Sequence, residues 1–431
     1  MNDETNFKIW EPRQKMWVLA AFSALLIGFG VLYDPSINLF RGLWEIIIHP
    51  DVLIIDYIAI GGLGAAFLNA GILTAACTFI LSKSKQPFNG IAFAAVFTIA
   101  GFSFLGKNLL NIWPILAGST LYALLKKERA TTYIYISLFG TAMSPIITEV
   151  LFHLDFPWTI SLLAGILLGM GIGFILPPLA AHFTKAHQGF NLYNVGFVSG
   201  LLLTGLAAIF QTFGYVATPN SIFADSYHTK LIIFSYTLNL LFVVAGLATD
   251  AKAFHYLKRA YKRSGQAPTD FIQLDGFSTT LLNIGISGAV ATSYILLVGG
   301  SMNGVLLGAV FTVMGFSAFG KTASNITPIM AGIYLGGLIG VWDTQAPGMI
   351  MAALFGTALS PIAGTYGIFW GIVAGFFHGA LVRQTGSFHA GLNLYNNGFA
   401  AGIVAMIMIP VLQAIIKPRN EKSIKKPLVA K

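Results

Sequence analysis

Charged side chains are scarce in this chain. Asp, Glu, Lys and Arg together make up 10% of its 431 residues, whereas an average soluble domain has about 25%. Hydrophobic residues make up 56%, and the mean hydropathy is +0.75. Apolar runs long enough to cross a hydrocarbon layer of about 30 Å as helices recur from Trp17 to Ile415. These features exclude a soluble domain and predict an all-α integral membrane protein.

Cysteine is almost absent, and this limits the chemistry. The single Cys77 lies in an apolar run, which excludes a disulfide framework and a cysteine metal site. The sequence also lacks a nucleophile-base pair, a cluster of metal ligands and a phosphate-binding loop. We therefore expect no cofactor, no metal and no enzymatic activity.

The formal net charge of +9 has a topological explanation. The basic residues fall in short loops between apolar segments, as the positive-inside rule predicts for cytoplasmic loops, so we expect no nucleic-acid partner. The expected partners are the lipid bilayer and a small-molecule or ion substrate, and the sequence is compatible with a homo-oligomer. The same rule places both termini in the cytoplasm.

Breaking the chain at its loops gives about fourteen hydrophobic segments. They run over residues 16–33, 52–82, 88–106, 109–125, 131–151, 157–180, 188–213, 230–249, 276–299, 303–320, 324–341, 348–366, 367–386 and 389–416. Residues 36–49 carry Phe40, Leu43, Trp44 and Ile47 along one side, which predicts an amphipathic helix in the membrane interface.

The chain contains a duplication. GFSFLGKNLLNIWPILAG at residues 101–118 returns as GFSAFGKTASNITPIMAG at 315–332, and the copies that begin at Asn89 and Asn303 agree at 17 of 30 positions. LNAG and LNIG precede the shared block, and FGTAMSP and FGTALSP, then HQGFNLYNVGF and HAGLNLYNNGF, follow it. Seven crossings separate corresponding points, and because seven is odd, the second copy should enter the membrane from the opposite face.

This pattern predicts five regions. They are an N-terminal tail with the first transmembrane helix and the interfacial helix (1–51), a first repeat (52–215), a linker helix with a basic cytoplasmic loop (216–275), a second, inverted repeat (276–416) and a basic cytoplasmic tail (417–431).

The shared block has too little chain for two comfortable spans. About 40 residues separate Lys85 from Lys126, both predicted to be cytoplasmic, and a Gly-Lys pair interrupts them. Re-entrant hairpins would bring both tips toward the membrane centre, where they could bind an anionic or strongly hydrogen-bonding solute. In the alternative, each lysine ends a full span and extends to the headgroups. The candidate substrate-binding residues of this block are Ser103, Lys107, Asn111, Ser317, Lys321 and Asn325.

The NLYNxGF element supplies a second candidate. Its asparagines lie three residues apart on one helical face, and they either line a pathway or hold helices together. These residues are Asn191, Asn194, Asn393 and Asn396. FGTAxSP favours a proline kink. Glu149, which has no acidic counterpart in the second copy, is a candidate for ion coupling or a solvated residue near the outer end of its segment.

Taken with these motifs, the repeat resembles a family of uncharacterised multi-pass bacterial membrane proteins known by a domain of unknown function. The resemblance covers most of residues 10–416 and implies the bacterial cytoplasmic membrane, but it supplies no activity. A weaker resemblance is to urea transporters, through Phe88-Asn89-Gly90 and Met302-Asn303-Gly304. We expect a secondary transporter of a small polar solute, with an anion favoured, that works by alternating access. The alternative is a passive channel for a small neutral solute.

Overall fold

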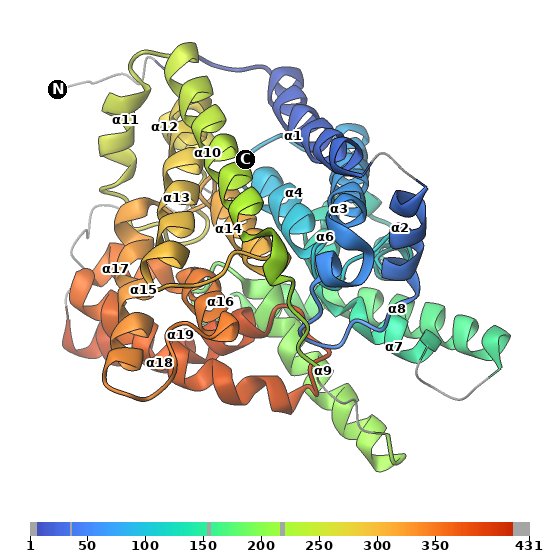
Figure 1. Cartoon of the computed structure of the whole chain (residues 1–431). Coiled ribbons are helices and arrows are strands. Elements are labelled where there is room, and N and C mark those ends of the chain that lie inside the picture. Colours follow the sequence, from blue (N-terminus) through green and yellow to red (C-terminus); the bar gives the residue numbers. More distant parts are fainter. Residues whose placement is uncertain (1–6, 35–36, 153–156, 216–219, 417–431) are drawn as a thin grey trace.

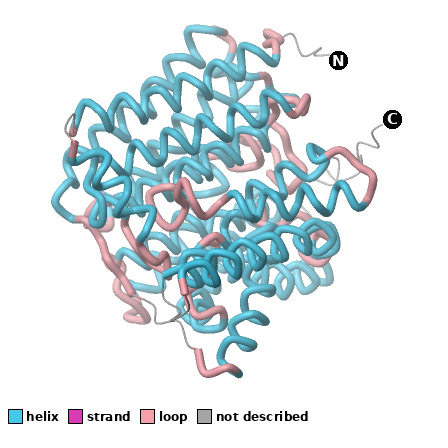
Figure 2. The backbone as a smooth tube through the Cα atoms, turned by 90° about the vertical axis from the view of Figure 1, so that its right-hand side faces the viewer, coloured by secondary structure: helices cyan, strands magenta, loops and turns pink. Residues whose placement is uncertain are grey.

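A computed structural model describes residues 7–34, 37–152, 157–215 and 220–416. Figure 2 shows this part of the chain as helices joined by loops and turns. The helices of the first half are α1 (Pro12–Tyr33), α2 (Asn38–Ile48), α3 (Tyr57–Lys83), α4 (Gly90–Phe102), α5 (Trp113–Leu125), α6 (Ile134–Gly140), α7 (Pro145–Phe152), α8 (Trp158–Phe183) and α9 (Asn194–Thr212). Those of the second half are α10 (His228–Thr249), α11 (Ala253–Ala260), α12 (Phe271–Asp275), α13 (Phe277–Leu297), α14 (Gly304–Phe316), α15 (Ala323–Leu338), α16 (Pro347–Gly356), α17 (Ser360–Tyr366), α18 (Ile368–Phe388) and α19 (Asn396–Ile415).

The structure confirms an α-helical membrane protein, but the prediction of fourteen spans is wrong. Among the described residues, eight helices are long and apolar enough to span a membrane, or nine if the bent pair formed by residues 130–143 and 145–152 is one span. The difference has a physical reason: α4, α5 and α14 have 13 residues each. They rise only about 20 Å, well short of the hydrocarbon thickness. The sequence count treated each arm of the repeated block as a separate span.

In each half, the repeated block forms two short helices joined by a turn. The turn between α4 and α5 contains Gly106 at φ +88°, and the turn between α14 and α15 contains Gly320 at φ +107°. Glycine adopts such positive φ values without the clash that a Cβ atom would cause. Non-helical backbone at membrane depth must be buried in protein or line a water-filled cavity. Both turns meet this condition, because the side chains of Lys107 and Lys321 are fully buried there.

The same helix pairs form in both halves. α1 packs on α3 and α10 packs on α13, while α5 packs on α8 and α15 packs on α18. Figure 1 shows α4 and α14 side by side in the middle of the molecule, and their contact joins the two halves. The helices touch at Gly101 and Gly308, where a Cβ atom added to either glycine would lie 2.3 Å from the carbonyl oxygen of the other. α9 and α19 make a second contact between the halves.

The expected interfacial segment also forms a helix. α2 has Phe40 and Trp44 exposed at 68% and 60% of their surface, and its other side packs on α3. Its place at a membrane interface stays a prediction. Residue 36 and the predicted basic tail, residues 417–431, lie outside the described residues.

Candidate functional site

An asparagine from a neighbouring helix holds each of the two Gly-Lys turns. Asn69 Nδ2 in α3 donates to the carbonyl oxygens of Ser103 (2.7 Å) and Lys107 (2.9 Å). Asn283 Nδ2 in α13 donates in the same way to Ser317 (2.7 Å) and Lys321 (2.8 Å). These carbonyls lie where α4 and α14 end and have no helical partner. The LNAG and LNIG motifs therefore stabilise the two breaks in the chain.

The lysine of each Gly-Lys turn makes a hydrogen bond to a tyrosine of the other half. Lys107 Nζ of the first half donates to the hydroxyl of Tyr395 (2.6 Å). Lys321 Nζ of the second half donates to the hydroxyls of Tyr193 (2.5 Å) and Thr357 (2.7 Å). Such reciprocal contacts are typical of two units related by a two-fold axis.

Neither ammonium group has an acidic neighbour among the described residues. Both lysines have 0% of their surface exposed, and the carboxylate ion pairs of the described chain involve neither of them. Each ammonium instead lies over aromatic rings, with Lys107 at 4.8 Å from the Tyr395 ring and Lys321 at 4.5 Å from the Tyr193 ring. A buried cation without an acid is costly, so the arrangement favours an anionic ligand.

The first asparagine of each NLYN element shapes the turn before a helix. Asn191 Oδ1 accepts from the Tyr193 amide (2.9 Å), and its Nδ2 donates to the Gly398 carbonyl of the other half (3.0 Å). Asn393 makes the equivalent contacts, to the Tyr395 amide (3.0 Å) and to the Gly196 carbonyl (3.5 Å). The element thus orients its tyrosine and also joins the halves.

The second asparagine of each element pairs with a histidine. Asn194 Oδ1 lies 2.8 Å from His187 Nε2, and Asn396 Oδ1 lies 3.0 Å from His389 Nε2. Asn194 also donates to the carbonyl oxygen of Ala180 at the end of α8 (3.0 Å). These contacts fasten α9 and α19 to the helices that precede them.

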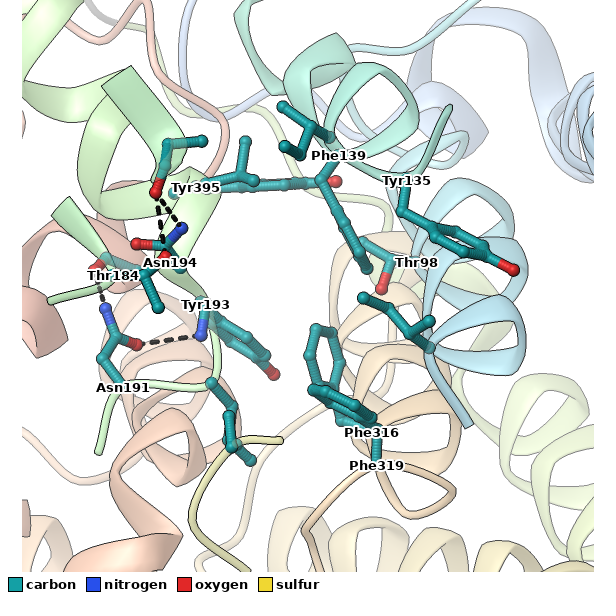
Figure 3. Close-up of a pocket in the computed structure, with 18 of the residues that line it drawn as sticks. Thr98, Tyr135, Phe139, Thr184, Asn191, Tyr193, Asn194, Phe316, Phe319 and Tyr395 are labelled. Carbon is teal, nitrogen blue, oxygen red and sulfur yellow. Dashed lines mark hydrogen bonds between the residues drawn. The ribbon is translucent and has the colours of Figure 1, made fainter. Parts of the chain in front are cut away.

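A cavity of about 380 Å³ lies between the halves. Figure 3 shows the rings of Tyr193, Tyr395, Phe139 and Phe316 around this space. Several repeat-equivalent pairs line it, namely Thr98 and Thr312, Phe102 and Phe316, Phe139 and Phe355, Leu192 and Leu394, Tyr193 and Tyr395, and Gly196 and Gly398. The cavity is therefore built from both copies at once.

The cavity is not equally open toward both ends. Ile91, Tyr135, Ile136 and Phe319 line it and are half-buried. Their repeat equivalents are closed by packing: Val305 and Ala352 have 0% of their surface exposed, Leu105 has 1% and Met351 has 4%. Loop residues Thr184, His187, Gly189, Ala267 and Pro268 also line the cavity.

The structure brings only some of the predicted residues to the cavity. Asn191 and Asn194 line it, and the lysines reach it through their tyrosine partners. The remaining predicted site residues make hydrogen bonds that stabilise helices and turns. Ser103 and Ser317 donate to Ile99 and Val313, Asn111 and Asn325 bond within their own turns, and Asn393 and Asn396 make the contacts described above.

Glu149 lies away from the cavity, in α7. It has 1% of its surface exposed and accepts a hydrogen bond from the Tyr215 hydroxyl, so the solvated interpretation is wrong. Asp51, which the sequence analysis did not single out, is also buried and accepts from Tyr57 (2.6 Å), Thr148 (2.9 Å) and Asn111 (3.0 Å).

Two further aspartates join the halves and were also missed. Asp56 Oδ2 accepts from the Gly304 amide at the start of α14 (3.0 Å), and Asp270 Oδ2 accepts from the Gly90 amide at the start of α4 (3.0 Å). A carboxylate at a helix N-terminus satisfies a free amide and interacts favourably with the helix dipole. The two aspartates are 214 residues apart, the same spacing as Asn89 and Asn303. Extending the repeat toward the N-terminus would have found them.

One protein family matches the chain over both copies. Its description is "Protein of unknown function (DUF1576)", and it matches residues 36–212 and again residues 249–414, which together are more than half of the chain. The chain belongs to this family. The two matches of the DUF1576 family agree with the duplication found in the sequence.

No curated protein and no solved structure matches the chain. The resemblance to urea transporters therefore has no support. Membership of the DUF1576 family places the chain among proteins of unknown function, so its function has to be inferred from the site.

Proposed function

We propose that this protein is a secondary transporter of a small polar solute, with an anion as the favoured cargo, in the bacterial cytoplasmic membrane. One observation carries the proposal. Two fully buried lysines, Lys107 and Lys321, donate to tyrosines that line a central cavity built from both repeats. A solute that carries negative charge would supply the partner that the described chain does not.

Inverted topology of the two halves is part of this proposal. In the first half, α1, α3, the bent α6–α7 pair, α8 and α9 would cross, and α4 with α5 would form a re-entrant hairpin that returns to its starting side. The second half offers the equivalent set of α10, α13, the α16–α17 segment, α18 and α19. Of these, α18 is not among the eight or nine candidate spans, but it pairs with α15 as α8 pairs with α5. Five crossings are an odd number, so the second half would start from the opposite face. Inverted repeats with a site at their interface are typical of secondary transporters.

The unequal ends of the cavity support alternating access. The open end lies beside loops that carry Lys185, Lys262 and Arg263, which the positive-inside rule places in the cytoplasm together with both termini. Exchanging the packing of the two ends would close this mouth and open the equivalent one. A passive channel, the alternative function, would need both ends open at once.

The test measures currents from proteoliposomes after concentration jumps of acetate, lactate, phosphate, sulfate and benzoate. We expect at least one of these anions to give a current that saturates with concentration. K107Q and K321Q should abolish it, while K258Q, which changes an exposed lysine of α11, should leave it unchanged. Size-exclusion chromatography checks that the variants remain folded. Undiminished currents in both K107Q and K321Q would rule out the site, and flux that rises linearly with concentration would identify a channel.

A further inference from the structure

We propose that the solute is an organic anion with an aromatic or similarly flat apolar body, rather than an inorganic ion or a short carboxylate. This inference rests on the proposed function and deepens it, because it names the class of solute for the same cavity. It rests on the size of the cavity, on its aromatic wall, and on the lysine ammonium groups that contact the tyrosines of this wall.

The cavity is large for a small ion. Its volume of about 380 Å³ is in the range of sites for organic ligands, roughly 300–1,000 Å³. A water molecule takes up about 30 Å³ in the liquid, so an inorganic anion of a few atoms would leave most of the space unfilled. The solute therefore needs a body as well as a charge.

Much of the wall is aromatic. The rings that line it are Phe102, Phe139, Phe316, Phe319, Phe355, Tyr135, Tyr193 and Tyr395. Such a wall offers stacking and edge-to-face contacts to a flat apolar group. It offers little to a strongly hydrated ion, which would lose its water without replacement.

The rings form two equivalent clusters that each combine both halves. In one, Phe102 lies against Phe355 with ring centroids 5.1 Å apart and against Tyr395 at 4.4 Å. In the other, Phe316 lies against Phe139 at 5.7 Å and against Tyr193 at 4.6 Å. A lysine ammonium sits behind each cluster. Each cluster thus offers an apolar surface and a positive charge together.

The Tyr395 hydroxyl connects the Lys107 ammonium to the cavity. Tyr395 accepts from Lys107 Nζ, and its own proton has no acceptor among the described residues. A hydroxyl that already accepts from an ammonium group is polarised to donate more strongly. A carboxylate or similar acidic group in the cavity can accept this proton in a hydrogen bond, while the body of the solute lies against the rings.

The experiment uses the purified full chain in detergent and compares three probes at equal concentration. Benzoate has a ring and a charge, acetate has the charge alone, and benzyl alcohol has the ring alone. We expect benzoate to raise the melting temperature clearly more than the other two. K107Q and K321Q should remove the benzoate shift, and K258Q should retain it.

A mild substitution tests the wall separately from the charge. Phe319→Leu introduces the residue found at the equivalent position, Leu105, and so should fold. It should weaken benzoate binding about three- to tenfold in a titration by calorimetry, as the loss of one ring contact predicts, with acetate unaffected.

The outcomes separate the two proposals. Equal shifts with acetate and benzoate, both lost in K107Q, would overturn the aromatic body and leave the anion transporter standing. A shift with benzyl alcohol that matches benzoate and survives K107Q and K321Q would overturn both. Failure of benzoate to stabilise the native chain while sulfate or phosphate does so would also overturn the inference on the solute class.

Discussion

The lysine and tyrosine pairs differ between the halves at the level of single residues. Among the described residues, the Lys107 ammonium has one hydrogen-bond acceptor, Tyr395, whereas the Lys321 ammonium has two, Tyr193 and Thr357. A hydrogen bond to a charged group contributes about 1.5–3 kcal/mol, and a buried donor left without a partner incurs the full desolvation cost. The two halves should therefore respond differently to the same substitution.

We predict that Tyr395→Phe destabilises the protein more than Tyr193→Phe, by about 1 kcal/mol or more. The first variant leaves Lys107 without an acceptor, while the second leaves Thr357 to accept from Lys321. Unfolding in mixed micelles measures the difference. Combining Tyr193→Phe with Thr357→Val should bring the second half to the level of Tyr395→Phe. Equal effects of the two single variants would contradict the hydrogen-bond assignment.

Single residues also show what the sequence could and could not predict. Lys107 and Lys321 were recognisable because a lysine repeated within an apolar block needs a physical reason. Their partners were not, because Tyr395 lies 288 residues from Lys107 and no local pattern connects positions so far apart. Buried asparagines were recognisable as functional or structural, but only the fold decides that Asn191 lines the cavity and that Asn111 closes a turn.

At the level of the helices, the close approach of α4 and α14 sets the geometry of the cavity. Gly101 and Gly308 meet without side chains between them, and a Cβ atom on either would lie 2.3 Å from the carbonyl oxygen of the other. Small residues at such contacts allow membrane helices to pack closely. Both helices carry cavity residues, such as Thr98 and Thr312, so forcing them apart would displace the wall.

We predict that Gly101→Ala and Gly308→Ala each lower the melting temperature and weaken benzoate binding. The added Cβ atom would meet the backbone carbonyl of the other helix, so the two helices would have to shift. Such overpacking destabilises a protein by about 1–3 kcal/mol. Gly28→Ala in α1 and Gly171→Ala in α8 are matched controls, because nothing lies within 4 Å of an added Cβ atom there. They should be neutral or slightly stabilising, since alanine favours helices. A loss of stability in the controls equal to that in Gly101→Ala would contradict the packing explanation.

Element lengths explain where the sequence misled the prediction of spans. Apolar composition identified the hydrophobic segments, but composition does not report where a helix ends inside the membrane. The helices α4 and α14 end at Phe102 and Phe316, next to turns that the Asn69 and Asn283 side chains stabilise. These asparagines come from other helices, so only the tertiary structure shows why 13-residue helices suffice.

At the scale of the whole molecule, the two halves make reciprocal contacts across their interface. Many contacts across the interface have an equivalent, including Asp56 with Gly304 and Asp270 with Gly90. The burial of the residues around the cavity does not follow this equivalence. The residues that line its mouth are half-buried, whereas their repeat equivalents are buried, and this difference can be measured with cysteine substitutions.

We predict that the two ends of the cavity react with thiol reagents in alternation. In a background where the buried Cys77 is replaced by Ala, Ile91→Cys and Phe319→Cys should react readily, because both positions are half-buried at the open mouth. Their equivalents, Val305→Cys and Leu105→Cys, should be protected in the same state, because packing covers them. A transported anion should increase labelling at 305 and 105 and decrease it at 91 and 319, since opening one end requires closure of the other.

Labelling rates with a membrane-impermeant reagent, applied from each side of oriented vesicles, measure this exchange. Simultaneous high reactivity at both ends would show a continuous pore, and with it a channel in place of a carrier.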